Sequence, residues 1–121
     1  MSYEDATRAL EAAIGPLPQG SDEIRRIEDA AQVATYAKLP MALVRGEGCY
    51  VETAEGRRYL DLYGGHAVAL TGHNHPRVVG AIQAQAERLL FYSNLVYSDV
   101  RAAAVDRLSR LAPDGLGHVF L

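Results

Sequence analysis

A loop rich in glycine and histidine occupies the middle of the chain, within the stretch LDLYGGHAVALTGHNHPRVVGAIQAQ over residues 60–85. Its unusual residues are Gly64, Gly65, His66, Gly72, His73 and His75. Glycine permits positive φ and a close approach of the backbone to another group. Loops of this kind on a rigid scaffold commonly carry binding sites. The pattern therefore predicts a short strand, then a binding loop, and then an amphipathic helix that begins at Pro76.

Composition limits the class of protein. The chain has 121 residues, of which 49% are apolar and 22% charged, as in one soluble globular domain. Its net charge is −3 and its arginines are dispersed, so there is no basic footprint for nucleic acid. The single cysteine, Cys49, excludes an intramolecular disulfide and fits a reducing compartment. The acidic N-terminus is unlike a signal peptide, and no stretch approaches the roughly 20 apolar residues of a membrane span, so we expect a cytoplasmic protein.

Local patterns before the loop predict two helices and then a hairpin. Residues 3–14 carry one apolar stripe at helical spacing, and the following Gly- and Pro-rich residues end it. Ser21 is the expected N-cap of a second helix. The buried face of that helix would be Ile24, Ile27 and Ala31. Alternating β-favouring side chains then predict strands at 50–53 and 59–63 around a turn.

Local patterns after the loop predict two more helices. The first begins at Pro76 and ends near Leu90, with an apolar stripe made of Val79, Ile82, Ala86, Leu89 and Leu90. Ser98 or Asp99 caps the last helix. Residues 117–121 then begin an apolar strand, which would have no sheet to join. We therefore expect the sequence to be cut at this point rather than completed.

Three segments in a fixed order resemble the N-terminal part of the class III pyridoxal-phosphate aminotransferases, and most closely the acetylornithine and ornithine branch. The segments are GEGCYVETAEGRRYLDLYGGHAVALTGHNHPRVVGAIQAQAERL, YSNLVY and LGHVFL. The likeness covers roughly residues 39–121. It implies an α/β fold, namely the small-domain segment and the first strand of the large domain of a fold-type-I transferase. The expected divisions are a helical segment at 1–38, a small-domain portion at 39–115, and the start of the large domain at 116–121.

The resemblance also implies the chemistry of the whole enzyme. Relatives use pyridoxal 5′-phosphate to move an amino group from an (acetyl)ornithine-like ω-amine to a 2-oxo acid such as 2-oxoglutarate, normally as homodimers. Their Schiff-base lysine, their pyridine-binding aspartate and their phosphate loop all lie outside these 121 residues. The only lysine here, Lys38, does not match the family position and is expected to be a solvated linker residue. The chain alone is therefore expected to be inactive, with no catalytic and no cofactor-binding residue.

The family pattern suggests roles for four residues of this chain. His66 occupies a position where relatives place a side chain that faces the substrate, although relatives carry an aromatic or aliphatic residue there. Tyr97 matches a tyrosine that can touch the substrate's side chain or carboxylate. Ser93 and Asn94 are expected near the dimer interface. The alternatives are a loop histidine bonded to backbone for His66 and a packing aromatic for Tyr97.

The remaining polar residues have simpler interpretations. His73 and His75 would share one face of a strand, which invites a metal hypothesis. Zinc needs three or four ligands, however, and only His66 lies nearby in sequence, so we expect no metal site. Their imidazoles should instead bond loop carbonyls. Asp61 could cap a turn or pair with a neighbouring arginine, and it is assigned no chemistry.

Three hypotheses follow. The chain is a segment of a class III aminotransferase, in which its partners are the remainder of its own polypeptide and a second copy. Alternatively, it is a non-catalytic truncated chain that docks on a full-length aminotransferase or another partner. The third hypothesis is a small metal-binding module built on the three loop histidines. Because the parent fold would cover much of its apolar surface, the isolated chain is expected to be aggregation-prone or molten.

Overall fold

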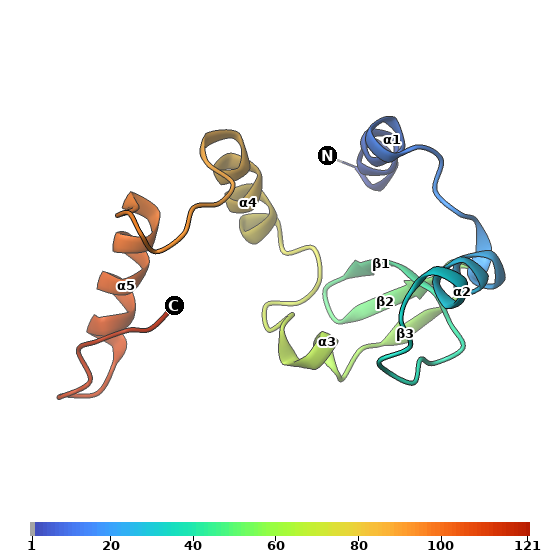
Figure 1. Ribbon diagram of the computed structural model, residues 1–121. Coiled ribbons are helices and arrows are strands. Elements are labelled where there is room, and N and C mark those ends of the chain that lie inside the picture. The colour runs from blue at the N-terminus through green and yellow to red at the C-terminus, as the bar shows by residue number, and fades with distance from the viewer. Residues whose placement is uncertain (1) are drawn as a thin grey trace. The chain divides into compact units, whose positions relative to one another are not determined.

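The computed structural model describes residues 2–121 and contains five helices and a small three-stranded antiparallel sheet (Figure 1). The elements are α1 (Tyr3–Ile14), α2 (Gly20–Ala31), β1 (Leu43–Glu47), β2 (Tyr50–Thr53), β3 (Arg58–Leu60), α3 (Gly64–Ala67), α4 (Pro76–Arg88) and α5 (Asp99–Leu111). The described chain forms two compact units, one that ends at Val79 and one over Gly80–Leu121. No described helix is long and apolar enough to cross a membrane.

The first helix has a complete N-terminal capping box. The Ser2 hydroxyl accepts from the Asp5 backbone N–H at 3.1 Å, and the Asp5 carboxylate accepts from the Ser2 N–H at 3.2 Å. Two donors that no helical carbonyl can reach are thereby satisfied. Gly15, with φ of 89°, ends the helix. The prediction of a helix over residues 3–14 is confirmed.

The second helix is capped by a residue distant in sequence. Ser21 lies inside the helix, which has Gln19 at the N-cap position, so the prediction that Ser21 is the N-cap was wrong. The Glu55 carboxylate instead accepts from the Ser21 N–H at 2.7 Å and from its hydroxyl at 2.9 Å. The Ser21 hydroxyl in turn accepts from the Ala42 N–H at 3.2 Å. A carboxylate at a helix N-terminus is favoured by the helix dipole, so Glu55 performs the capping function.

The sheet is an antiparallel meander in the order β1–β2–β3. Pairing brings Gly46 opposite Val51, and Val51 opposite Tyr59. A β-bulge interrupts the first pair between Leu43 and Arg45. The predicted hairpin is confirmed, with β3 ending at Leu60 rather than near residue 63. The chain leaves the sheet early because Asp61 begins the loop described below.

The second unit contains most of α4 and all of α5. Helix α4 begins at Pro76 as predicted and ends at Arg88. The Ser98 hydroxyl accepts from the Arg101 N–H at 3.4 Å, which confirms Ser98 as the cap of α5. The Arg88 guanidinium donates to the Asp99 carboxylate at 2.7 Å, and this exposed ion pair joins the two helices. Residues 117–121 form no strand, contrary to the prediction, because no described strand pairs with them.

Few side chains are buried within the described residues. Ala42 is the one buried apolar residue among them, and it lies beside the buried polar residues Ser21 and Thr53. The stripe predicted to be buried on α2 is largely open, with Ile27 41% exposed, because little packs against it. Apolar side chains such as Leu62, Leu95 and Phe120 are at least 89% exposed. The polar contact between α2 and the β2–β3 turn therefore supplies much of the order in the first unit.

Candidate functional site

The loop that follows β3 is organised by one carboxylate. Oδ1 of Asp61 accepts from the backbone N–H groups of Tyr63 at 2.9 Å and Gly64 at 2.8 Å. Its Oδ2 lies 2.7 Å from Nε2 of His73. The hydrogen bond from His73, followed by those from Gly64 and Tyr63, holds the pKa of Asp61 below its usual value. Since an ionised carboxylate can only accept, the proton of the Asp61–His73 contact lies on Nε2.

The backbone after Asp61 makes a left-handed helical turn, the element α3. All four of its residues, Gly64–Ala67, have φ between 58° and 68°. Left-handed geometry costs an L-residue about 1–2 kcal/mol, so His66 and Ala67 are both strained. Hydrogen bonds from the Ala67 N–H to the Tyr63 carbonyl and from the Val68 N–H to the Gly64 carbonyl close the turn. Strain held in this way is commonest at functional sites.

His66 is displayed on this turn. Its side chain is exposed, and its ring lies against the Tyr63 ring with centroids 5.2 Å apart and planes tilted by 42°. No hydrogen bond from the His66 side chain is seen among residues 2–121. The arrangement leaves both ring nitrogens open to another molecule. The prediction that His66 faces a substrate remains a prediction.

The second half of the loop is fastened to the β1–β2 hairpin. Gly48 and His73 exchange two backbone hydrogen bonds, of 2.9 and 2.7 Å. Gly46 lies so close that a Cβ added there would be 2.7 Å from Cβ of His73. Gly72 has φ of 82°, and a Cβ there would meet the Gly48 carbonyl oxygen at 3.0 Å. Close approach therefore requires glycine at 46 and 72, which explains the composition of the loop.

The loop histidines make separate contacts and do not gather into one cluster in the described part of the chain. Within residues 2–121, no three His, Cys, Asp or Glu side chains form a group that could hold an ion. His73 is bonded to Asp61, not to a loop carbonyl as predicted, because the carboxylate is the stronger acceptor. His75 precedes α4, and its carbonyl accepts from the Val78 and Val79 N–H groups. Its buried Nδ1 has no hydrogen-bond partner within residues 2–121, so the prediction that the His75 imidazole bonds a loop carbonyl was wrong. The metal-module hypothesis therefore has no geometric support in this part of the chain.

Three other residues with suggested roles lie together in the second unit. Ser93 is half-buried, and its hydroxyl accepts from the Leu95 N–H at 3.4 Å. Asn94 and Tyr97 line a groove of about 500 Å³ between residues 94–98, the first half of α5, and residues 119–121. The Tyr97 side chain is fully exposed. This surface is mainly apolar, and it leaves Tyr97 free for contact with another molecule.

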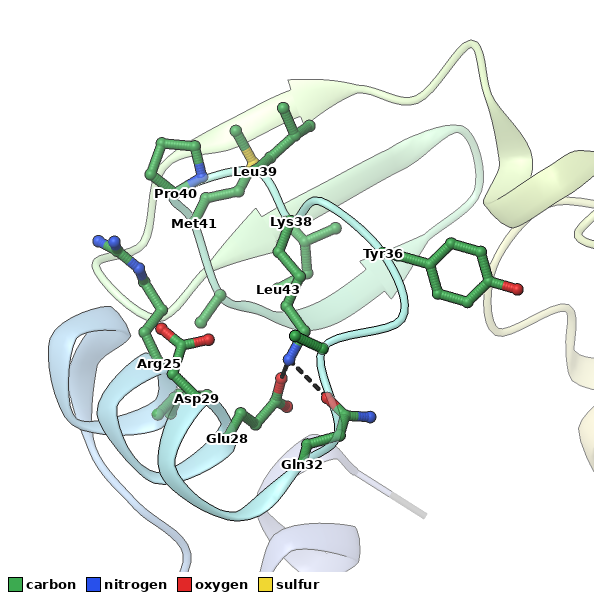
Figure 2. A pocket seen from close by; sticks show the side chains of 13 residues that line it. Arg25, Glu28, Asp29, Gln32, Tyr36, Lys38, Leu39, Pro40, Met41 and Leu43 are labelled. Atoms are coloured by element: carbon green, nitrogen blue, oxygen red, sulfur yellow. Dashed lines mark hydrogen bonds and ion pairs between the residues drawn. The ribbon is translucent and has the colours of Figure 1, made fainter.

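A second groove, of about 470 Å³, lies between α2 and the segment that leads to β1 (Figure 2). Lys38 is held there, with Nζ 2.7 Å from the Glu28 carboxylate and 2.5 Å from the Gln32 side-chain oxygen. Tyr36 points away from these groups in Figure 2. Sequence reasoning did not find this groove, because its lining comes from residues that show no shared local pattern.

The described residues do not fit a complete pyridoxal-phosphate site. A Schiff base requires a free lysine amine, and Lys38, the only lysine of the chain, is exposed and paired with Glu28. The groove around it in Figure 2 is lined by acidic, apolar and polar residues and by Arg25, and its lining includes no glycine.

Comparison with known proteins identifies the family. The sequence model of the family Aminotransferase class-III matches residues 31–121. The chain belongs to the class III aminotransferases. It is 43% identical to an acetylornithine aminotransferase from Methanopyrus kandleri over 98 residues, which cover 81% of this chain and 25% of that protein. The chain thus spans about a quarter of the length of this curated relative.

Solved structures of aminotransferases share its fold. Acetylornithine aminotransferase from Elizabethkingia anophelis matches with a TM-score of 0.72 and 29% identity, over 77% of this chain and 24% of that one. A thermostable (S)-enantioselective omega-transaminase from Thermomicrobium roseum matches with a TM-score of 0.75 and 30% identity, over 84% of this chain and 25% of that one. The predicted α/β fold of the pyridoxal-phosphate-dependent aminotransferases is confirmed.

Proposed function

We propose that the protein acts as a pyridoxal-phosphate-dependent aminotransferase that takes an amino group from an (acetyl)ornithine-like ω-amine and gives it to a 2-oxo acid such as 2-oxoglutarate. The match to the family over residues 31–121 carries this proposal. The names of the similar proteins, an acetylornithine aminotransferase and an omega-transaminase, support a terminal amine as donor. A lysine, an aspartate and a phosphate loop supplied by the remainder of a longer polypeptide would hold the cofactor, which serves as the electron sink.

Within that enzyme, this chain would build one wall of the substrate pocket. The open ring nitrogens of His66 would face the amine substrate, and Tyr97 would contact the substrate's side chain or carboxylate. Ser93 and Asn94 would lie near the interface of a homodimer. The support is the exposure of His66 and Tyr97 together with the strained turn that carries His66. The expected domain divisions at residues 38 and 115 stay with this proposal.

A transamination assay tests the proposed function. The native protein is purified, its intact mass is recorded, and it is incubated with pyridoxal phosphate, N-acetylornithine or ornithine, and 2-oxoglutarate. We expect glutamate to form in step with loss of the amine. A chain restricted to residues 1–121 serves as the control and should produce none. Native protein that binds pyridoxal phosphate yet forms no glutamate with either amine would contradict the proposed donor.

The exposed apolar groove of the second unit favours a second candidate function. Leu95 and Phe120 are 90% and 99% exposed, more than an isolated soluble unit needs. A non-catalytic chain that docks on a full-length aminotransferase or another partner would cover them. Cross-linking in native extract, followed by mass spectrometry, distinguishes the two. A partner encoded by a different gene supports docking, whereas cross-links only to a second copy, or within one longer polypeptide, support the enzyme.

A further inference from the structure

We propose that Asp61 and His73 are positioning residues, which fix the left-handed turn α3 and through it the direction in which His66 faces the amine substrate. The inference rests on the proposed function, because it names the residues that orient one wall of the same pocket. The described contacts of the Asp61 carboxylate and the His73 imidazole are with each other and with the backbone of the turn.

Asp61 holds the backbone at the start of the turn. Both N–H groups that bond to Oδ1 of Asp61 belong to the residues where the backbone changes direction, Tyr63 and Gly64. Gly64 is the first residue with positive φ. Without the Asp61 carboxylate, these two N–H groups would bond to water. An extended backbone would then be favoured, because it avoids the strain of positive φ. Asp61 therefore selects the left-handed conformation over its competitors.

His73 holds the Asp61 side chain in place. His73 bonds the other carboxylate oxygen, and its side chain is about one quarter exposed. The backbone of His73 is paired with Gly48, and its Cβ fills the space left by the missing side chain of Gly46. The imidazole is therefore anchored to the β1–β2 hairpin. Asp61 is thereby held between the turn on one side and the sheet on the other.

The conformation of the turn sets the direction of the His66 side chain. The His66 ring rests on the Tyr63 ring, and the Tyr63 N–H is one of the two groups that Asp61 holds. The backbone of His66 has φ of 68° and ψ of 39°, a conformation that persists only when its surroundings over-determine it. Loss of the Asp61–His73 contact would let the turn relax. The imidazole of His66 would then point in a different direction.

Two kinds of measurement test the inference on the native, full-length protein. The first does not depend on activity. NMR of 15N-histidine-labelled protein should show the proton of His73 on Nε2, and Asp61→Ala should abolish this preference. Asp106→Ala, which removes an exposed carboxylate paired only with Arg110 on α5, is the matched control and should leave the His73 signals unchanged.

The second measurement is kinetic. Asp61→Ala and His73→Leu should raise KM for the amine by on the order of tenfold to a hundredfold, with the KM for the 2-oxo acid and the absorbance of bound cofactor little changed. His73→Gln retains a donor near the position of Nε2 and should recover most of the loss. In a His66→Ala background, Asp61→Ala should add no further increase, because the two residues act on the same contact.

The outcomes separate the inference from the function on which it rests. Absence of transamination in the native protein overturns the proposed function, and the NMR result still tests the Asp61–His73 contact. Normal KM for the amine in Asp61→Ala, or fully additive effects in the His66→Ala background, overturns the positioning role. If Asp61→Ala fails to fold, His73→Leu is compared with His73→Gln. Equal increases in KM for the amine in these two variants would contradict the positioning role.

Discussion

The Nε2 atom of His73 lies 2.7 Å from Oδ2 of Asp61, although the two residues are twelve positions apart in the chain. This bond, together with the N–H groups of Gly64 and Tyr63, lowers the pKa of Asp61. A lowered carboxylate pKa means that the bond is intact above the ordinary aspartate range and is lost only as the pH falls through the lowered value. The Asp61–His73 hydrogen bond should therefore remain formed at neutral pH.

Substitution of Gly46 should disturb the position of His73 and thereby its hydrogen bond with Asp61. Gly46→Ala places a Cβ at 2.7 Å from Cβ of His73, and neither the strand nor the paired loop can move freely away. We expect a loss of about 1–3 kcal/mol of stability, typical of overpacking. The measurement is the denaturant midpoint of the native protein.

Gly80→Ala is the matched control for Gly46→Ala. Gly80 lies in α4 with negative φ, and no atom comes within 4 Å of an added Cβ. Alanine is the better helix former, so this variant should be neutral or more stable by about 0.4–1 kcal/mol. Equal effects of the two substitutions would contradict the close contact between Gly46 and His73.

Relief of backbone strain should stabilise the turn. Ala67 has φ of 59°, which glycine adopts at no steric cost. Ala67→Gly should therefore raise stability by about 1 kcal/mol, less the extra entropy of glycine in the unfolded chain. Thermal unfolding of the native protein measures the change. A clear decrease in the midpoint would show that the turn is not left-handed at this residue.

The contact between Glu55 and the N-terminus of α2 should weaken at low pH. Hydrogen bonds from the Ser21 hydroxyl and N–H lower the pKa of Glu55 from 4.5 to about 2. Its contribution to stability is therefore complete above pH 4.5 and is lost as the pH falls toward 2. In Glu55→Gln, hydrogen-exchange protection of the Ser21 amide should already be reduced at neutral pH.

A glutamate without such contacts provides the control for Glu55. Glu87 on α4 makes no ion pair or side-chain hydrogen bond within residues 2–121, so Glu87→Gln should leave protection at Ser21 unchanged. If Glu55→Gln and the unaltered protein lose protection at Ser21 over the same acid range and to the same extent, the capping role of Glu55 is wrong.

The isolated 121-residue chain should not unfold cooperatively. Ala42 is the one buried apolar residue among those described, whereas Leu62, Leu95 and Phe120 are almost fully exposed. A cooperative transition needs a shared apolar core, since hydrophobic burial is the main term that offsets chain entropy. Calorimetry at micromolar concentration should show a broad transition or aggregation. A sharp two-state transition would contradict this prediction.

Helices and turns in this chain were predictable wherever the signal is local. Pro76 begins α4 and Ser98 caps α5 as expected, because proline geometry and a hydroxyl cap act within a few residues. The hairpin was predictable for the same reason. Asp61 had two equal interpretations, and the structure has the turn cap, whereas no pairing with Arg57 or Arg58 is seen within residues 2–121.

The errors share one cause, which is that the deciding partner lies far away in sequence. Ser21 looked like an N-cap, but Glu55, 34 residues later, takes over the capping. Residues 117–121 have an apolar strand composition yet form no strand, since no described strand pairs with them. The left-handed turn at His66 was not foreseen either, because positive φ is uncommon for any residue other than glycine, and alanine at position 67 gives no local signal for it.

The sequence alone determined the family, the hairpin, the helices that begin at Pro76 and after Ser98, and the glycines of the loop, because these depend on short motifs and local backbone preferences. Only the tertiary structure determined which residues of the loop contact one another. It joined Asp61 to His73, set His73 against Gly46, and so held His66 on a strained turn. The physical reason is that hydrogen bonds and close contacts between residues 12 to 34 positions apart depend on how the chain folds back on itself, which no local pattern encodes.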